Sequence, residues 1–224
     1  MATYVLIPGA GDTAWSWSFV AAELRERGHD AIAVDLPCAD DSAGLTEYTD
    51  TVIEAIGDRT DLVVVAHSLG AFTAPLVCAR VAAKLLVLAA GMVPRPGETA
   101  SEWWTTSGYA EATRDETDYG DDTIALFMQD VAPDRAAEML ARGPGQSGTP
   151  MGEPWPLDAW PDVPTRYLLF RDDRFFPADF CRRLARERLG VVADEIDGSH
   201  CAYLSRPEEL ASRLDAYELG RSAV

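Results

Sequence analysis

Residues 61–72 read DLVVVAHSLGAF, a run of strand-forming residues that passes directly into a histidine, a serine and a glycine. The apolar run 62–65 suits the interior of a parallel sheet, where both faces of a strand are covered. From Gly70 onward the chain is rich in Ala and Leu at helical spacing, with Pro75 as its one poor helix former. The stretch therefore predicts a strand, a tight turn at Ser68 and a helix.

The turn has the pattern Ala66-x-Ser68-x-Gly70, which differs from G-x-S-x-G by one exchange of a small residue. A serine on such a turn projects its hydroxyl above the carboxyl edge of the sheet, next to the N-terminal N–H groups of a helix. The alternative is that Ser68 only caps that helix, since serine is a favoured N-cap. Because a short pattern with one mismatch often arises by chance, features elsewhere in the chain are needed to choose between these two roles of Ser68.

Apolar strand-like runs recur along the chain, at 3–7, 31–35, 62–66, 85–89, 166–170 and 191–196. Amphipathic helical stretches lie between most of them, and three of these close on a glycine, the expected helix stop: Gly28, Gly57 and Gly190. Alternating strands and helices require crossover connections. We therefore predict an α/β fold, doubly wound, with a mostly parallel sheet of about six strands.

The alternation breaks once, between residues 92 and 163. This segment holds four of the six tryptophans, many Pro and Gly, and one convincing helix at 134–143. It is too long for a plain loop and too polar for a missing strand. We expect a core from 1–91 and 164–224 and an inserted lid at 92–163, with a solvated surface elaboration as the alternative.

The composition is that of an ordinary soluble globular protein, with 47% hydrophobic and 25% charged residues. A net charge of −18 opposes binding to nucleic acid, and Lys84 is the only lysine available for lysine chemistry. The four cysteines have neither C-x-x-C nor zinc-site spacing, which predicts free thiols and no bound metal. With no secretion signal and no apolar run long enough for a membrane helix, we expect a cytoplasmic protein. Its expected oligomeric state is a monomer or homodimer.

A serine nucleophile needs a base, which is nearly always histidine, and the chain has three. His29 precedes a strand at the amino edge of the sheet and is expected to be an exposed turn residue. His67 is adjacent to Ser68, so its ring is expected to point away and pack behind the strand. His200 follows the last strand and emerges at the same edge as Ser68. We predict that His200 is the base.

The base needs an acceptor that holds its tautomer. Asp172 and Asp173 both follow the strand at 166–170, and neighbouring residues face different ways, so one can reach His200 while the other pairs with a nearby arginine. The chain order Ser, Asp, His is that of α/β-hydrolases. This agreement favours a catalytic Ser68 over a capping one.

Acyl transfer also needs donors for an oxyanion. The N–H of Leu69 follows the nucleophile directly, and the glycine-rich loop after the first strand offers the N–H of Ala10. That loop matches neither G-x-G-x-x-G nor G-x-x-x-x-G-K-[ST], so no nucleotide cofactor is expected.

The chain resembles the α/β-hydrolase superfamily over nearly its whole length, and is most similar to the small esterases and hydroxynitrile lyases that include plant salicylate methyl esterases and their bacterial relatives. The matching segments are VLIPGAGDTAWSW, HDAIAVDLP, VVVAHSLGAF, DDRFFP and GSHCAYLSRPEEL. The resemblance implies that Asp173, four residues before the proline of a D-x-x-x-P segment, is the acid, with Asp172 as the runner-up. It also places the oxyanion loop at Gly9 and Ala10.

The chain departs from patterns of this family at three informative positions. The usual His-Gly pair is Pro8-Gly9, so any hydrogen bond from that histidine is lost. The lyases have Thr at the position of Gly9 and Lys at that of Cys201, and both differences imply ester hydrolysis.

The sequence thus predicts a carboxylesterase without cofactor or metal that cleaves a small ester through an acyl-enzyme on Ser68, with His200 and Asp173. Alternatives are a catalytically weak small-molecule receptor on the same fold and a hydroxynitrile lyase-like enzyme. An apolar, aromatic-lined pocket suits a hydrophobic or aromatic ester. The alternative for any single one of its expected walls is ordinary core packing. The expected walls are Gly9, Trp15, His67, Met92, Trp103, Trp104, Phe127 and Phe176.

Overall fold

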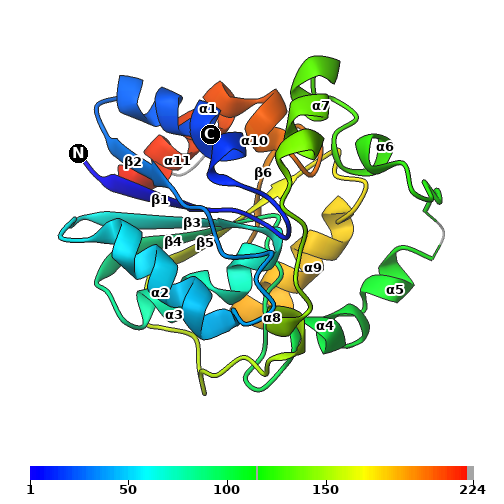
Figure 1. Ribbon diagram of the computed structural model, residues 1–224, viewed down its shortest axis with the longest axis horizontal. Coiled ribbons are helices and arrows are strands. Elements are labelled where there is room, and N and C mark those ends of the chain that lie inside the picture. Colours follow the sequence, from blue (N-terminus) through cyan, green and yellow to red (C-terminus); the bar gives the residue numbers. More distant parts are fainter. Residues whose placement is uncertain (115, 221–224) are drawn as a thin grey trace.

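The computed structural model describes residues 1–114 and 116–220. Within these residues six strands form one parallel sheet in the order β2-β1-β3-β4-β5-β6 (Figure 1). The strands are β1 (Thr3–Ile7), β2 (Asp30–Ala33), β3 (Leu62–His67), β4 (Ala83–Ala89), β5 (Thr165–Phe170) and β6 (Asp194–Ile196). The prediction of a doubly wound α/β fold is confirmed, and β6 is shorter than the run that predicted it.

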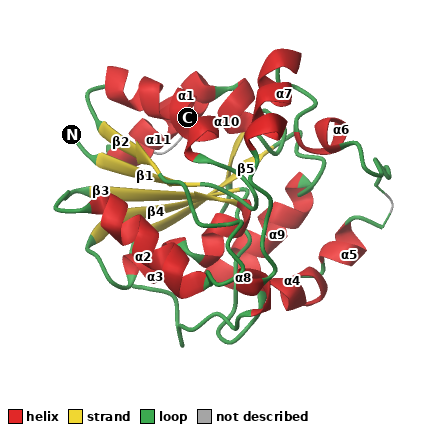
Figure 2. Cartoon of the chain, in the orientation of Figure 1, coloured by secondary structure: helices red, strands yellow, loops and turns green. Residues whose placement is uncertain are grey.

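Helices cover both faces of the sheet (Figure 2). On one face lie α1 (Ala14–Glu26) and α11 (Pro207–Glu218), which pack on each other, and on the other lie α2 (Leu45–Ile56) and α3 (Ala74–Cys78). α9 (Ala178–Leu189) packs against β5. Because both faces are covered, every residue of β1 and β3 is buried, as their continuous apolar runs predicted.

The predicted helix from Gly70 is wrong in its first part. The chain first makes a 3₁₀ turn, η1 (Ser68–Phe72), and only then enters α3. Pro75 lies in the first turn of α3, where its missing N–H is not needed, so the proline starts this helix rather than distorting it.

Residues 92–163, between β4 and β5, form the β4–β5 segment. In its described part it holds five short helices beyond the carboxyl ends of the strands (Figure 1). Only α7 matches the helix that periodicity predicted, because the others are too short to show a period. The helices are α4 (Ala100–Thr106), α5 (Tyr109–Ala112), α6 (Thr123–Phe127), α7 (Pro133–Arg142) and α8 (Thr149–Gly152).

Two carboxylates, of which Glu98 is buried, join this segment to the rest of the molecule. Glu98 forms an ion pair with Arg188 of α9, with Oε1 3.0 Å from Nη2, and the two side chains are 6% and 2% exposed. Glu153 accepts a hydrogen bond from the N–H of Leu45 at the N-terminus of α2, at 2.7 Å. The segment is therefore attached both to α9 and to the start of α2.

His29 is not the exposed turn residue that its position before β2 suggested. Its side chain is 6% exposed, because Nδ1 accepts from the N–H of Ala2 at 3.1 Å and Nε2 lies 2.9 Å from Asp215 Oδ1 on α11. It does lie at the amino edge of the sheet, away from Ser68.

Among the described residues, no helix has the length and apolar character needed to cross a membrane.

Candidate active site

Ser68 occupies a strained turn immediately after β3. Its φ is +49°, in the left-handed region that non-glycine residues rarely adopt. Gly70 allows this turn to pack, since a Cβ there would lie 2.5 Å from the carbonyl oxygen of Pro8. The buried Ala66 is accommodated within β3, where the family pattern has glycine. A strained serine against a required glycine is the geometry of a nucleophile elbow.

His200 and Asp173 form a buried pair at the same edge of the sheet. His200 Nδ1 lies 2.7 Å from Asp173 Oδ2. The other carboxylate oxygen, Oδ1, accepts the N–H groups of Phe175 and Phe176 at 2.8 and 2.9 Å. These two bonds orient the carboxylate, which in turn holds the proton on Nδ1 and leaves Nε2 of the imidazole able to accept one.

Asp172 lies outside this pair. It is exposed, and its Oδ2 accepts the N–H of Gly198 at 3.0 Å. The prediction that it pairs with an arginine is wrong, because Arg171 turns to Asp197 and Glu195 instead. Asp172 therefore helps to fold the loop that carries His200.

The ring of His67 lies beneath His200, with ring centroids 4.5 Å apart. Its Nε2 lies 2.9 Å from the carbonyl oxygen of His200, and since a carbonyl only accepts, Nε2 is the protonated nitrogen. Burial, followed by the nearby charge of His200, lowers the pKa of His67 well below its ordinary value. His67 does not simply pack behind the strand: it supports His200 and borders the cavity described below.

Ser68 and His200 line one cavity of about 380 Å³ at the carboxyl ends of the strands. No hydrogen bond joins the Ser68 hydroxyl to the His200 ring among the described residues. Catalytic hydrogen bonds of this kind commonly tighten only when substrate binds.

The loop after β1 approaches Ser68 closely. A Cβ on Gly9 would lie 2.9 Å from His67 Nδ1 and 3.1 Å from Ser68 Cβ, so only glycine fits there. Gly9 and Ala10 line the cavity together with Leu69. The backbone that was predicted to supply oxyanion donors thus borders the same space as the Ser68 hydroxyl.

Asp12 and Tyr203 are site residues that sequence reasoning missed. Asp12 lines the cavity and accepts hydrogen bonds from Ser16 Oγ at 2.7 Å and from the Tyr203 hydroxyl at 3.1 Å. Burial raises the pKa of the Asp12 carboxyl despite these bonds. Asp12 thereby connects the loop after β1 to the helix that follows His200, a contact across 191 residues of sequence that no local pattern signals.

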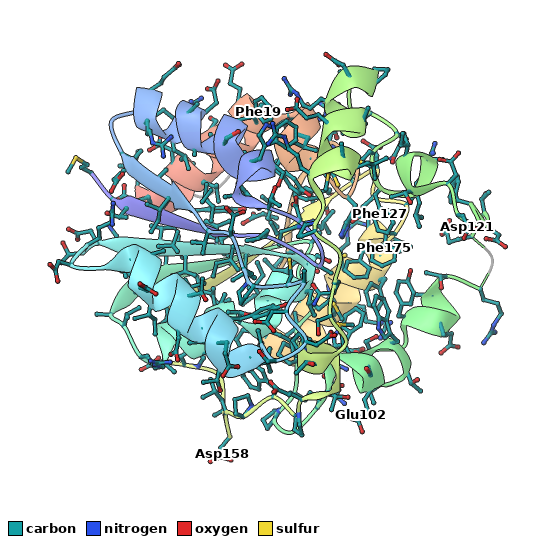
Figure 3. All side chains as sticks on the ribbon, in the orientation of Figure 1. Phe19, Glu102, Asp121, Phe127, Asp158 and Phe175 are labelled. Carbon is teal, nitrogen blue, oxygen red and sulfur yellow. The ribbon has the colours of Figure 1, made fainter. Side chains whose placement is uncertain are left out.

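Five of the predicted pocket walls line the cavity: Gly9, His67, Met92, Trp104 and Phe127. Sequence reasoning missed Phe175, whose ring lies beside that of Phe127 with centroids 4.6 Å apart (Figure 3). It also missed that four of the five methionines of the chain border this one space: Met92, Met128, Met139 and Met151. The described walls are therefore largely apolar and polarisable.

Three predicted walls lie elsewhere. Trp103 is fully buried in the core, with its Nε1 donating to the carbonyl of Val93 at 3.1 Å. Phe176 is also fully buried, with its ring edge-on to His200 at 5.1 Å. Trp15 packs on Phe19 of its own helix. Large aromatic residues fill the core as readily as they line a pocket, so residue type alone cannot separate the two positions.

In the part of the chain that the structure describes, no cluster of three or more His, Cys, Asp or Glu side chains is arranged to hold a metal ion. The four cysteines are free and buried.

Comparison with known proteins gives one consistent result. The model of the alpha/beta hydrolase family matches residues 4–213. Methylesterase 7 of Arabidopsis thaliana is 24% identical over an alignment of 246 residues that covers 94% of each chain. The probable esterase PIR7A of Oryza sativa subsp. indica is 34% identical over 109 residues, covering 42% of this chain and 41% of that protein.

Among solved structures, an extracellular alpha/beta-hydrolase from a Paenibacillus species superposes with a TM-score of 0.79 at 21% identity. The superposition covers 97% of this chain and 99% of that one. At this identity the likeness concerns the fold.

Proposed function

Because the chain belongs to the alpha/beta hydrolase family, we propose that it is a serine esterase that cleaves small, uncharged carboxylic esters. Ester hydrolysis is supported by the methylesterase and esterase relatives. The observation that carries the proposal is the buried His200–Asp173 pair, which borders the same cavity as Ser68 on its strained turn.

The proposed chemistry begins at the Ser68 hydroxyl. Nε2 of His200 takes its proton as the oxygen attacks the ester carbonyl, and Asp173 stabilises the imidazolium through Nδ1. The N–H groups of Ala10 and Leu69 bind the oxyanion. His200 then protonates the leaving alcohol, and a water activated by the same imidazole releases the acid from the acyl-enzyme.

The proposed substrate class follows from the cavity. Its described walls include four methionines and four aromatic side chains, Trp104, Phe127, Phe175 and Tyr203, but no lysine or arginine. Thioethers adapt to irregular apolar groups and contact aromatic rings favourably. A free carboxylate elsewhere on the ester substrate would find no cationic partner there and would lie in the same cavity as Asp12. A neutral apolar or aromatic ester fits this space best.

In this proposal the β4–β5 segment is the lid of the site, and residues 1–91 and 164–224 are the catalytic core. The segment supplies Met128, Met139 and Met151 to the cavity as well as Trp104 and Phe127. It thus shields the reacting groups from water and shapes the substrate space. The free, buried cysteines support a reducing, cytoplasmic location.

The test is hydrolysis of p-nitrophenyl esters of short acyl chains by the purified protein and by Ser68→Ala. We expect the substitution to lower kcat at least ~10⁴-fold, because the nucleophile is lost. Ser18→Ala is the matched control, since Ser18 is an exposed serine on α1. A fluorophosphonate probe should label the wild type stoichiometrically and leave Ser68→Ala unlabelled. Equal activity of Ser68→Ala and wild type would refute the mechanism, and labelling without turnover would instead favour a receptor.

A further inference from the structure

A side chain of the β4–β5 segment holds the loop after β1. Gln146 Oε1 accepts the N–H of Gly11 at 3.1 Å. Gly11 follows Ala10 directly, and Ala10 is one of the two proposed oxyanion donors. The peptide group next to that donor is therefore held by the lid.

The Gln146 amide is fixed in orientation by both of its ends. A backbone N–H can only donate, so Oε1 must face Gly11 and Nε2 must face the other way. Nε2 donates to the Tyr48 hydroxyl at 3.1 Å and to the carbonyl of Ser147 at 2.9 Å. Tyr48 is a buried residue of α2, so the amide is held against the core of the protein.

The backbone around Gln146 is itself anchored to the chain before α2. The N–H of Ser147 donates to the carbonyl of Cys38 at 2.6 Å. The hydroxyl of Thr149 donates to the carbonyl of Asp41 at 2.7 Å. Gln146 thus extends from a seated part of the lid toward the loop after β1.

The loop needs an external support because glycines flank its donor. Gly9 and Gly11 lie on either side of Ala10, and Gly11 has a φ of +63°. Glycine allows many backbone conformations, so the direction of the Ala10 N–H is not set locally. On the Gly9 side, close packing against His67 and Ser68 limits the backbone. On the Gly11 side, the hydrogen bond to Gln146 does so.

We propose that Gln146 is a positioning residue that keeps the Ala10 N–H aimed into the oxyanion hole, so that the hole is complete only while the lid is seated. This role rests on the proposed esterase function. An oxyanion donor stabilises the transition state more than the bound ester, so its misplacement lowers kcat and leaves KM nearly unchanged. A shift of about 1 Å in such a group costs up to ~10²-fold.

The test compares Gln146→Leu with Gln146→Glu, two substitutions of similar size. Both remove the amide donor to Tyr48 and to the carbonyl of Ser147. Leu also removes the acceptor for the Gly11 N–H, whereas Glu keeps a carboxylate oxygen there. We expect Gln146→Leu to lower kcat about 10- to 100-fold with KM within about twofold. Gln146→Glu should recover most of that loss. Inhibition by a trifluoromethyl ketone, which forms a tetrahedral oxyanion on serine, should weaken in Gln146→Leu by the same factor as kcat.

Thr51→Val is the matched control, because it removes a threonine hydrogen bond to the carbonyl of Glu47 within α2, which belongs neither to the anchor of the lid nor to the loop after β1. Its kcat should equal that of the wild type. An equal loss of kcat in Thr51→Val, an unchanged kcat in Gln146→Leu, or an equal loss in Gln146→Glu would each overturn the positioning role while the esterase function stands. An inactive wild type would overturn the proposed function, and the positioning role with it.

Discussion

At the scale of single residues, His67 shows how burial sets the state of a titratable group. Its Nε2 donates to the backbone of His200, and its Nδ1 is buried without a hydrogen-bond partner in the described structure. Protonation would place a positive charge in a fully buried position beside His200. The neutral ring is therefore the stable form, which is why burial depresses the pKa of His67.

This depressed pKa predicts an acid-sensitive contribution to stability. Below its ordinary pKa of 6.5, His67 takes up a proton in the unfolded chain but not in the folded one. The free energy of unfolding therefore falls as pH drops, by about 1.4 kcal/mol per pH unit for this one group. His67→Gln keeps an N–H donor for the His200 carbonyl and does not titrate.

Urea unfolding at pH 7.5 and at pH 5.5 measures this effect in both proteins. The wild type should lose about 1.4 kcal/mol more than His67→Gln between these two values, the other titrating groups being shared. If both proteins lost the same free energy, the buried neutral state of His67 would be contradicted.

At the scale of elements, the β4–β5 segment is attached to α9 by the Glu98–Arg188 ion pair. Both side chains are buried, and Arg188 also donates to the carbonyl of Val93 at 2.6 Å. Glu98 Oε2 further accepts the N–H of Arg95 at 3.0 Å. Such a pair offers modest net stability while intact, but removing one partner leaves a charge buried and unpaired.

Arg188→Met should therefore lower the free energy of unfolding by about 3–5 kcal/mol, measured by chemical denaturation. The comparison is Arg80→Met, which breaks the ion pair between Arg80 and Asp50. The side chains of these two residues are 49% and 56% exposed. An exposed pair contributes little, so this second variant should change stability by less than about 1 kcal/mol. If both variants lost a similar free energy of unfolding, the loss in Arg188→Met would not be due to the burial of the Glu98–Arg188 pair.

At the scale of the whole molecule, the net charge of −18 acts on any charged substrate before it reaches the cavity. A field of one sign repels anionic molecules at long range and is screened by salt, with a Debye length of about 10 Å at 0.1 M. The described cavity walls carry no lysine or arginine to offset this repulsion. A neutral ester does not sense the field.

We therefore expect kcat/KM for the mono-p-nitrophenyl ester of adipic acid to lie at least ~10-fold below that for p-nitrophenyl hexanoate at low salt. Added sodium chloride should raise the value for the anionic ester and leave the neutral one nearly unchanged. Initial rates for the two esters across a salt series measure both effects. Equal kcat/KM values for the pair at low salt would contradict the proposed preference for uncharged substrates.

The sequence by itself determined the framework of this protein. Continuous apolar runs predict buried parallel strands, and helices ending at glycines predict crossovers between them, because both signals are local and periodic. The carboxyl ends of parallel strands meet at one edge, so the sequence also brought Ser68, His200 and Asp173 to the same side of the sheet. Asp173 rather than Asp172 was implied by a family resemblance, and the structure has Asp173 facing His200.

The tertiary structure alone decided what surrounds that edge. The β4–β5 segment has no long period, so nothing local distinguishes Trp103, which fills the core, from Met128, which borders the cavity. The contacts of Asp12 with Tyr203 and of Gly11 with Gln146 join residues 191 and 135 positions apart. Such contacts depend on how irregular loops fold back on the sheet, and loop packing is set by the whole molecule rather than by neighbouring residues.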